Sequence, residues 1–131
     1  MRAINLKTNH LTEPVGIDAG ALFLSWQCAD GVRQTAYAIE LTANGETVWH
    51  SSKVQSTAMH ADATTVGGSR VRGCWRVRLW DENDTPGAWS AAHFETGLAQ
   101  SDWQGKWVDP ETEEIDIPGD DAINAFARPN W

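Results

Sequence analysis

The sequence contains few cysteines, few basic residues and no long hydrophobic run. Its two cysteines neither demand nor exclude an oxidising compartment. Its 10 basic residues are outnumbered by 18 acidic ones, and phosphate neutralisation supplies most of the affinity of nucleic-acid binders. No apolar run approaches the roughly 20 residues that cross a membrane. We therefore expect neither nucleic acid nor membrane as a partner.

The sequence also lacks the motifs that carry common chemistry. It has no Gly-x-Ser-x-Gly elbow, no phosphate-binding loop and no dinucleotide fingerprint. Its four histidines have no spacing typical of a zinc site. We therefore predict no catalytic residue, no cofactor and no metal in this chain. Residues 1–14 lack the apolar core of a secretory signal, which favours a cytoplasmic location.

Acidic residues are concentrated near the C-terminus. Residues 97–131 carry eight acidic and two basic side chains, a balance of −6, whereas residues 1–96 carry ten acidic and eight basic ones, a balance of −2. Most of these carboxylates lie in 109–121, which proline and glycine interrupt. Paired-carboxylate catalysis needs two such groups fixed across a cleft. We interpret this stretch as a solvated linker.

The segment 74–81 has the clearest pattern in the chain. Its residues alternate strictly, with Trp75, Val77 and Leu79 on one face and Arg76, Arg78 and Trp80 on the other. A period of two with aromatic and β-branched residues predicts a half-buried strand. The apolar face of such a strand requires a second sheet to cover it.

Similar patterns predict about seven short strands and no helix. Their ranges are 4–11, 22–28, 34–42, 47–51, a weak strand at 57–63, 72–81 and 89–96. Asn44-Gly45 between two of them is a strong hairpin signal. Regularly spaced short strands with turn signals indicate an all-β protein, an antiparallel β-sandwich.

The alternation also predicts which side chains form the core. We expect the core to contain Trp26, Tyr37, Ile39, Trp75, Val77, Leu79 and Phe94, with Ala36, Ala38 and Glu40 pointing outward. Cys28 shares the inward face of its strand, while Cys74 shares the outward face of the strand at 72–81. Because two cysteines whose Cα–Cβ vectors point apart cannot form a disulfide, we predict two free thiols.

Eight short motifs in this order resemble one family. They are LKTNHL (6–11), PVGID (14–18), FLSW (23–26), QTAY (34–37), WHSSKV (49–54), WRVRLWD (75–81), WS (89–90) and WQGKW (103–107). Together they look like the N-terminal domain of bacterial α-L-rhamnosidases. The resemblance covers roughly residues 5–108 and implies a fibronectin type III-like, immunoglobulin-like sandwich.

Members of that family are several times longer than this chain. The resemblance implies that further β-domains and a helical barrel follow, and that an acidic pair in the barrel hydrolyses α-L-rhamnosides with inversion. None of those catalytic motifs occurs here. The chain alone is therefore expected to be no enzyme, whereas the parent protein is expected to be an inverting glycoside hydrolase.

These observations predict a division of the chain and a role for it. We expect a sandwich at 1–98, a Trp-rich packing segment at 99–108, and at 109–131 an acidic linker with the start of a missing domain. The expected role is that of a non-catalytic N-terminal accessory domain, or fragment, of an α-L-rhamnosidase-like glycoside hydrolase. It would pack on the catalytic domains, which are absent here, and position them. The alternative is a free-standing module that binds carbohydrate or protein.

One outward-facing group is the candidate contact surface. It consists of Trp80, Arg76, Arg78 and Glu40. In a sandwich of this kind the strands at 34–42 and 72–81 are neighbours, so Glu40 is placed to pair with Arg76 or Arg78, and an arginine to lie over Trp80. Plain sheet surface or domain packing is one interpretation, and contact with a ligand such as a rhamnose-containing glycan is the other.

Overall fold

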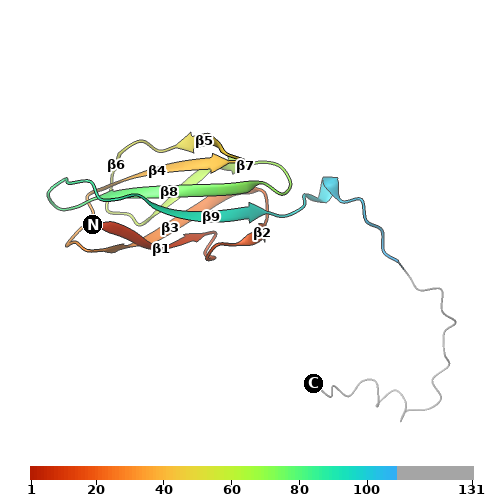
Figure 1. Cartoon of the computed structure of the whole chain (residues 1–131), viewed down its shortest axis with the longest axis horizontal. Coiled ribbons are helices and arrows are strands. Elements are labelled where there is room, and N and C mark those ends of the chain that lie inside the picture. The colour runs from red at the N-terminus through yellow and green to blue at the C-terminus, as the bar shows by residue number, and fades with distance from the viewer. Residues whose placement is uncertain (109–131) are drawn as a thin grey trace, which may run out of the picture.

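Two β-sheets packed face to face make up the fold (Figure 1). The computed structural model describes residues 1–108, and within them nine strands occur. The smaller sheet has the order β1 (Arg2–Thr8), β3 (Gly20–Ala29) and β7 (His60–Val66). The larger sheet has the order β2 (Val15–Ile17), β9 (Ser90–Thr96), β8 (Arg72–Trp80), β4 (Ala36–Ala43) and β5 (Glu46–His50), with β6 (Val54–Gln55) also on β4.

This arrangement confirms the predicted all-β sandwich. All strand pairs are antiparallel except β2 with β9, which is parallel. A short 3₁₀ turn, η1 (Gln100–Asp102), follows β9. The chain then leaves the sandwich at the end of the sheet where β9 finishes (Figure 1).

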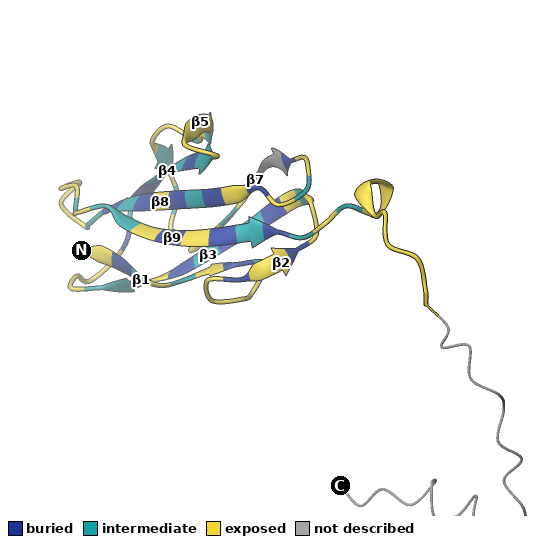
Figure 2. Ribbon diagram, turned by 45° about the vertical axis from the view of Figure 1, so that its right-hand side comes forward, coloured by how far each residue is buried: buried dark blue, intermediate teal, exposed yellow. Residues whose placement is uncertain are grey.

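Strand β8 lies at the centre of the larger sheet because its sequence has one fully apolar face. Trp75, Val77 and Leu79 are completely buried, as their alternation predicted. The stripes of buried and exposed residues along β8 and β9 show the same alternation (Figure 2). All seven predicted core residues lie in the single buried cluster between the sheets.

Two buried indoles also make hydrogen bonds. The Trp75 Nε1–H donates to Thr8 Oγ1 at 2.9 Å, which connects β8 of one sheet to β1 of the other. The Trp26 Nε1–H donates to Gln34 Oε1 at 3.0 Å, and Gln34 Nε2 in turn donates to the Ala58 carbonyl at 2.8 Å. The polar atoms that accompany these large rings into the core are thus paired, as burial requires.

Strand β2 was not among the strands predicted from the sequence. The structure places Val15–Ile17 at the edge of the larger sheet, beside β9. Pro14 has no N–H to donate, and it contacts the sheet through its carbonyl, which accepts the Glu95 N–H at 2.9 Å. Gly16 adopts a φ of 86°, a conformation that suits glycine. An edge position tolerates both residues.

The bounds of two predicted strands differ most from those in the structure. The first ends at Thr8 instead of residue 11, because Asn9 and His10 adopt positive φ values and the Leu11 N–H bonds back to the Thr8 carbonyl. The weak strand predicted at 57–63 is β7, which begins at His60 and continues to Val66.

Ala36 points outward, as predicted, and is nevertheless buried. Its strand alternation does place it on the outer face, opposite Trp80 on β8 and Gln55 on β6. A methyl group between two larger side chains is covered by them, so its exposed fraction is 0%. Alternation therefore gave the direction of this side chain and not its accessibility.

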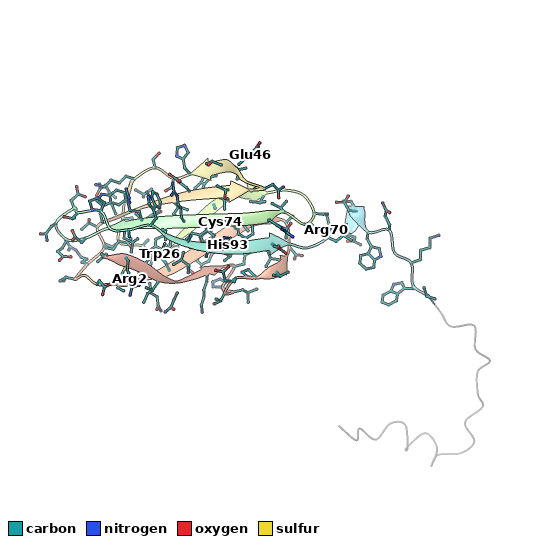
Figure 3. The ribbon with its side chains drawn as sticks, in the orientation of Figure 1. Arg2, Trp26, Glu46, Arg70, Cys74 and His93 are labelled. Carbon is teal, nitrogen blue, oxygen red and sulfur yellow. The ribbon has the colours of Figure 1, made fainter. Side chains whose placement is uncertain are left out.

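The two cysteines are free thiols, as predicted. Cys28 packs against the core on β3, where burial raises its thiol pKa. Cys74 lies on the outer face of β8 beside His93 of β9 (Figure 3). Burial, and then the charge of Glu13, raise the pKa of the Cys74 thiol, so both cysteines are protonated at neutral pH.

Replacing Trp26 by alanine tests the core. Trp26→Ala should lower the free energy of unfolding by about 3–5 kcal/mol, because it opens a cavity and leaves Gln34 without its indole donor. Urea unfolding followed by circular dichroism measures this. Val48→Ala is the control, since Val48 is 49% exposed and its loss should change stability by less than about 0.5 kcal/mol. Equal unfolding midpoints for Trp26→Ala and wild type would contradict the assignment.

Candidate functional site

The outer face of the larger sheet carries the predicted contact residues. Strand pairing sets Glu40 of β4 opposite Arg76 of β8, and Ala38 opposite Arg78. On the other side of β8, Ala91 of β9 is opposite Arg76. We call the group Glu40, Arg76, Arg78, Trp80 and Trp89 the Arg–Trp face. The structure therefore brings all four predicted residues together and adds Trp89.

Arg76 pairs with Glu40 across the two strands. The Arg76 Nε–H donates to Glu40 Oε2 at 2.7 Å, and a terminal guanidinium nitrogen contacts the same oxygen. Both side chains remain partly exposed. This is one of the two ion pairs that the sequence suggested for Glu40. Its contribution to stability is small, since solvent screens such pairs.

Two arginines lie over Trp89. The guanidinium carbon of Arg76 is 4.4 Å from the Trp89 ring centroid, and that of Arg78 is 4.8 Å away. The sequence suggested Trp80 as the ring under an arginine, but the cation over Trp80 is the Lys53 ammonium, at 4.8 Å. Lys53 belongs to the connection between β5 and β6. The alternation of residues in β8 carries no information about the path of that connection.

Trp89 was not among the contact residues predicted from the sequence. Its place on this face follows from the β8–β9 register, in which Val77 pairs with Ser90 and Trp89 therefore follows opposite Arg78. The sequence signal for this placement was the number of residues between Trp80 and Trp89. That number does not give the register of the two strands, because the turn between them is irregular.

Asp81 holds this irregular turn in shape. Its Oδ1 accepts the backbone N–H groups of Asn83 and Thr85, both at 2.9 Å. The Thr85 N–H, and to a smaller degree that of Asn83, lower the pKa of the Asp81 carboxyl. The Gly87 N–H then donates to the Leu79 carbonyl at 2.8 Å, which returns the chain to β8. This turn sets the position of Trp89.

Arg78 differs from the other two cations near this face. Lys53 pairs with Asp84 at 2.7 Å, and Arg76 pairs with Glu40. Arg78 makes no ion pair within residues 1–108, and its buried Nε atom has no hydrogen-bond partner there. The face thus holds one guanidinium whose charge is not matched by a neighbouring carboxylate in the described part of the chain.

A second surface lies where the chain leaves the sandwich. Here Trp103 is 66% exposed, Trp107 is fully exposed, and Leu98 is also exposed. With Ile17 and Gly97 these side chains line an open groove. Whether the segment 99–108 packs on another domain stays a prediction, and the predicted linker and domain start at 109–131 lie outside the described residues.

The described residues show neither a cluster of metal-ligating side chains nor a membrane-spanning helix. Within 1–108, no group of three or more His, Cys, Asp or Glu side chains converges to hold a metal ion. In the same part of the chain, no helix has the length and apolar character needed to cross a membrane.

A family model described as "Rha78A-like, N-terminal immunoglobulin domain" matches residues 3–100, which include the described strands except for Arg2, the first residue of β1. The chain belongs to this family. The resemblance to α-L-rhamnosidases is thereby confirmed, and the sandwich is an N-terminal immunoglobulin domain of the Rha78A-like kind.

Similar proteins agree with this assignment. The chain is 32% identical to an α-L-rhamnosidase of Streptomyces avermitilis over 91% of its own length, and 31% identical to one of Alteromonas over 79%. A solved α-L-rhamnosidase structure from Dictyoglumus thermophilum matches 83% of the chain with a TM-score of 0.75 and 27% identity. The chain spans only 13% of either curated relative, in their N-terminal regions.

Replacing Trp89 tests the arrangement on the Arg–Trp face. Trp89→Leu should lower the free energy of unfolding by roughly 1–2 kcal/mol, because each guanidinium contact is worth about 0.5–1 kcal/mol at an exposed site. The effect should shrink when Arg78 is already Gln, since one contact is then absent. Urea unfolding of the single and double variants measures it. Trp103→Leu, at an exposed position, is the control, and equal losses in the two indole variants would contradict the stacking.

Proposed function

We propose that this immunoglobulin domain is a non-catalytic accessory domain of a longer α-L-rhamnosidase-like glycoside hydrolase, where it packs on the catalytic domains and positions them. The observation that carries the proposal is the combination of family and length. The chain matches the N-terminal regions of α-L-rhamnosidases and spans 13% of each curated relative. Most of such a relative lies outside the part that this chain matches.

The surfaces of the domain support a packing role. Trp103 and Trp107 expose large apolar rings at the end from which the chain continues. Exposed clusters of this kind commonly mark contact sites. The Arg–Trp face has tryptophan and arginine together, the side chains most enriched at the energetic centres of interfaces. Both surfaces are therefore suited to contact with neighbouring domains.

The carboxylates of the sandwich support a non-catalytic role. Inverting glycosidases need a general acid and a general base on opposite sides of the scissile bond, with room for a water molecule. Here Glu40, Asp84 and Glu95 accept ion pairs from Arg76, Lys53 and Arg72. Asp81 caps a turn. These carboxylates have structural partners, so we assign the hydrolytic pair to the longer protein.

Carbohydrate binding by the sandwich itself receives less support. A sugar stacks on an indole whose face is open to solvent. Trp80 and Trp89 are only partly exposed, and cations from Lys53, Arg76 and Arg78 already lie over their rings. The two indoles of the Arg–Trp face are thus already in contact with protein cations. Packing against other domains is the role that we favour.

The size of the native gene product tests the proposal. Intact-mass measurement from the source cells should find a species many times heavier than the 14.4 kDa of this chain, because the relatives are about that much longer. Antibodies raised against the sandwich identify the species. A native product of 14.4 kDa would mean that the domain has no covalent parent.

Turnover of an aryl α-L-rhamnoside tests the division of labour. The isolated 131-residue chain should release no more aryl alcohol than a blank, whereas the native longer product should release it readily. The heat-inactivated longer product is the control. Clear turnover by the isolated chain would sink the non-catalytic assignment.

A further inference from the structure

Arg78 is the unmatched group on the Arg–Trp face. Two of the three nearby cations have carboxylate partners, with Arg76 on Glu40 and Lys53 on Asp84. In the described part of the chain Arg78 has neither an ion pair nor an acceptor for its buried Nε–H. The guanidinium of Arg78 is therefore the one cation on this face whose charge has no carboxylate partner within residues 1–108.

The guanidinium of Arg78 is already held in one place. It lies 4.8 Å from the Trp89 centroid, and that ring is fixed by the turn after β8. A planar guanidinium held on an aromatic ring loses little freedom when it binds, and its fork of N–H groups matches the two oxygens of a carboxylate. Arg78 is therefore prepared to receive a carboxylate group.

The neighbouring positions leave room for a partner to approach. Ala38 is opposite Arg78 on β4, and Ala91 is opposite Arg76 on β9. Methyl groups on both sides let another surface come close to the guanidinium and to the indole. A protein surface with an Asp or Glu beside apolar side chains fits both features, because the carboxylate meets Arg78 while the apolar part packs on the methyl groups of Ala38 and Ala91.

We propose that the Arg–Trp face docks a carboxylate-bearing surface of another domain of the longer protein, with Arg78 as the receiving group. The inference rests on the proposed function, which supplies the partner. Charge complementarity identifies the contact, since the face offers one unmatched cation. A contact of this kind supplies the Arg78 guanidinium with the carboxylate partner that it lacks in residues 1–108.

Coupling by a carbodiimide tests the contact in the native longer protein. Arg78→Lys places an amine on the face, and a zero-length carbodiimide joins an amine only to a carboxylate that touches it. Mass spectrometry should then find position 78 linked to an Asp or Glu of another domain. Arg78→Gln should lack this link. Arg72→Lys is the matched control, because Arg72 lies on the same face of β8 and contacts Glu95 at 3.2 Å, so it should link to Glu95.

A proteolysis measurement complements the coupling and uses no lysine substitution. Arg78→Gln should speed release of the sandwich by cleavage within 99–108 by about tenfold, because loss of a charge-assisted pair weakens docking. Arg72→Gln should leave the rate unchanged. Urea unfolding of the free 131-residue chain shows whether Arg78→Gln remains folded, so that a folding defect is not mistaken for undocking.

The outcomes separate this inference from the proposed function. A longer native product in which position 72 links and position 78 does not, with equal proteolysis rates, overturns the inference and leaves the proposed function standing. A link from position 78 to residues 109–121 or to a second copy also overturns it, since the occupant is then different. A native product of 14.4 kDa overturns both, because no other domain exists to dock.

Discussion

The packing of Trp75 between the two sheets is the constraint on which the rest of the structure depends. This indole is completely buried at the centre of β8, and its Nε1–H bonds to Thr8 of the opposite sheet. A buried indole needs a hydrogen-bond acceptor for its N–H group, and here Thr8 of the opposite sheet supplies it. The bond therefore fixes the position of β8 relative to β1. With Trp75 directed inward, Arg76 and Arg78 must point outward. The composition of the Arg–Trp face thus follows from the burial of Trp75 in the core.

The same register has a cost at the next inward position. Gly73 lies opposite Phe94, and a Cβ at Gly73 would approach the Phe94 ring to 2.0 Å. The absent side chain makes the space that the phenyl ring fills, in a core with no room to spare. Trp75, Gly73 and Phe94 therefore specify one alignment of β8 and β9. That alignment carries Trp89 to its place beside the two arginines.

Much of the fold was predictable from alternation, and part of the site was as well. Period-two patterns gave the core residues and the outward direction of Glu40, Arg76 and Arg78, because side-chain direction in a strand is a local property. The neighbouring of β4 and β8 came from the resemblance to known sandwiches. The cation over each indole was not predictable. It depends on the position of Lys53 in the connection after β5, and on the irregular turn whose hydrogen bonds to Asp81 place Trp89.

The sequence by itself determined the sandwich, its buried faces, the two free thiols and the family, since each depends on residue type and order along the chain. Only the tertiary structure decided that β2 joins the edge of the larger sheet and that Ala36 is covered. It also decided that Arg78 lacks an acceptor within residues 1–108. The physical reason is that strand pairing, the burial of a side chain and the hydrogen bonding of a polar atom all involve groups far apart in sequence. Local pattern gives the direction of a side chain, and the folded neighbours give it partners.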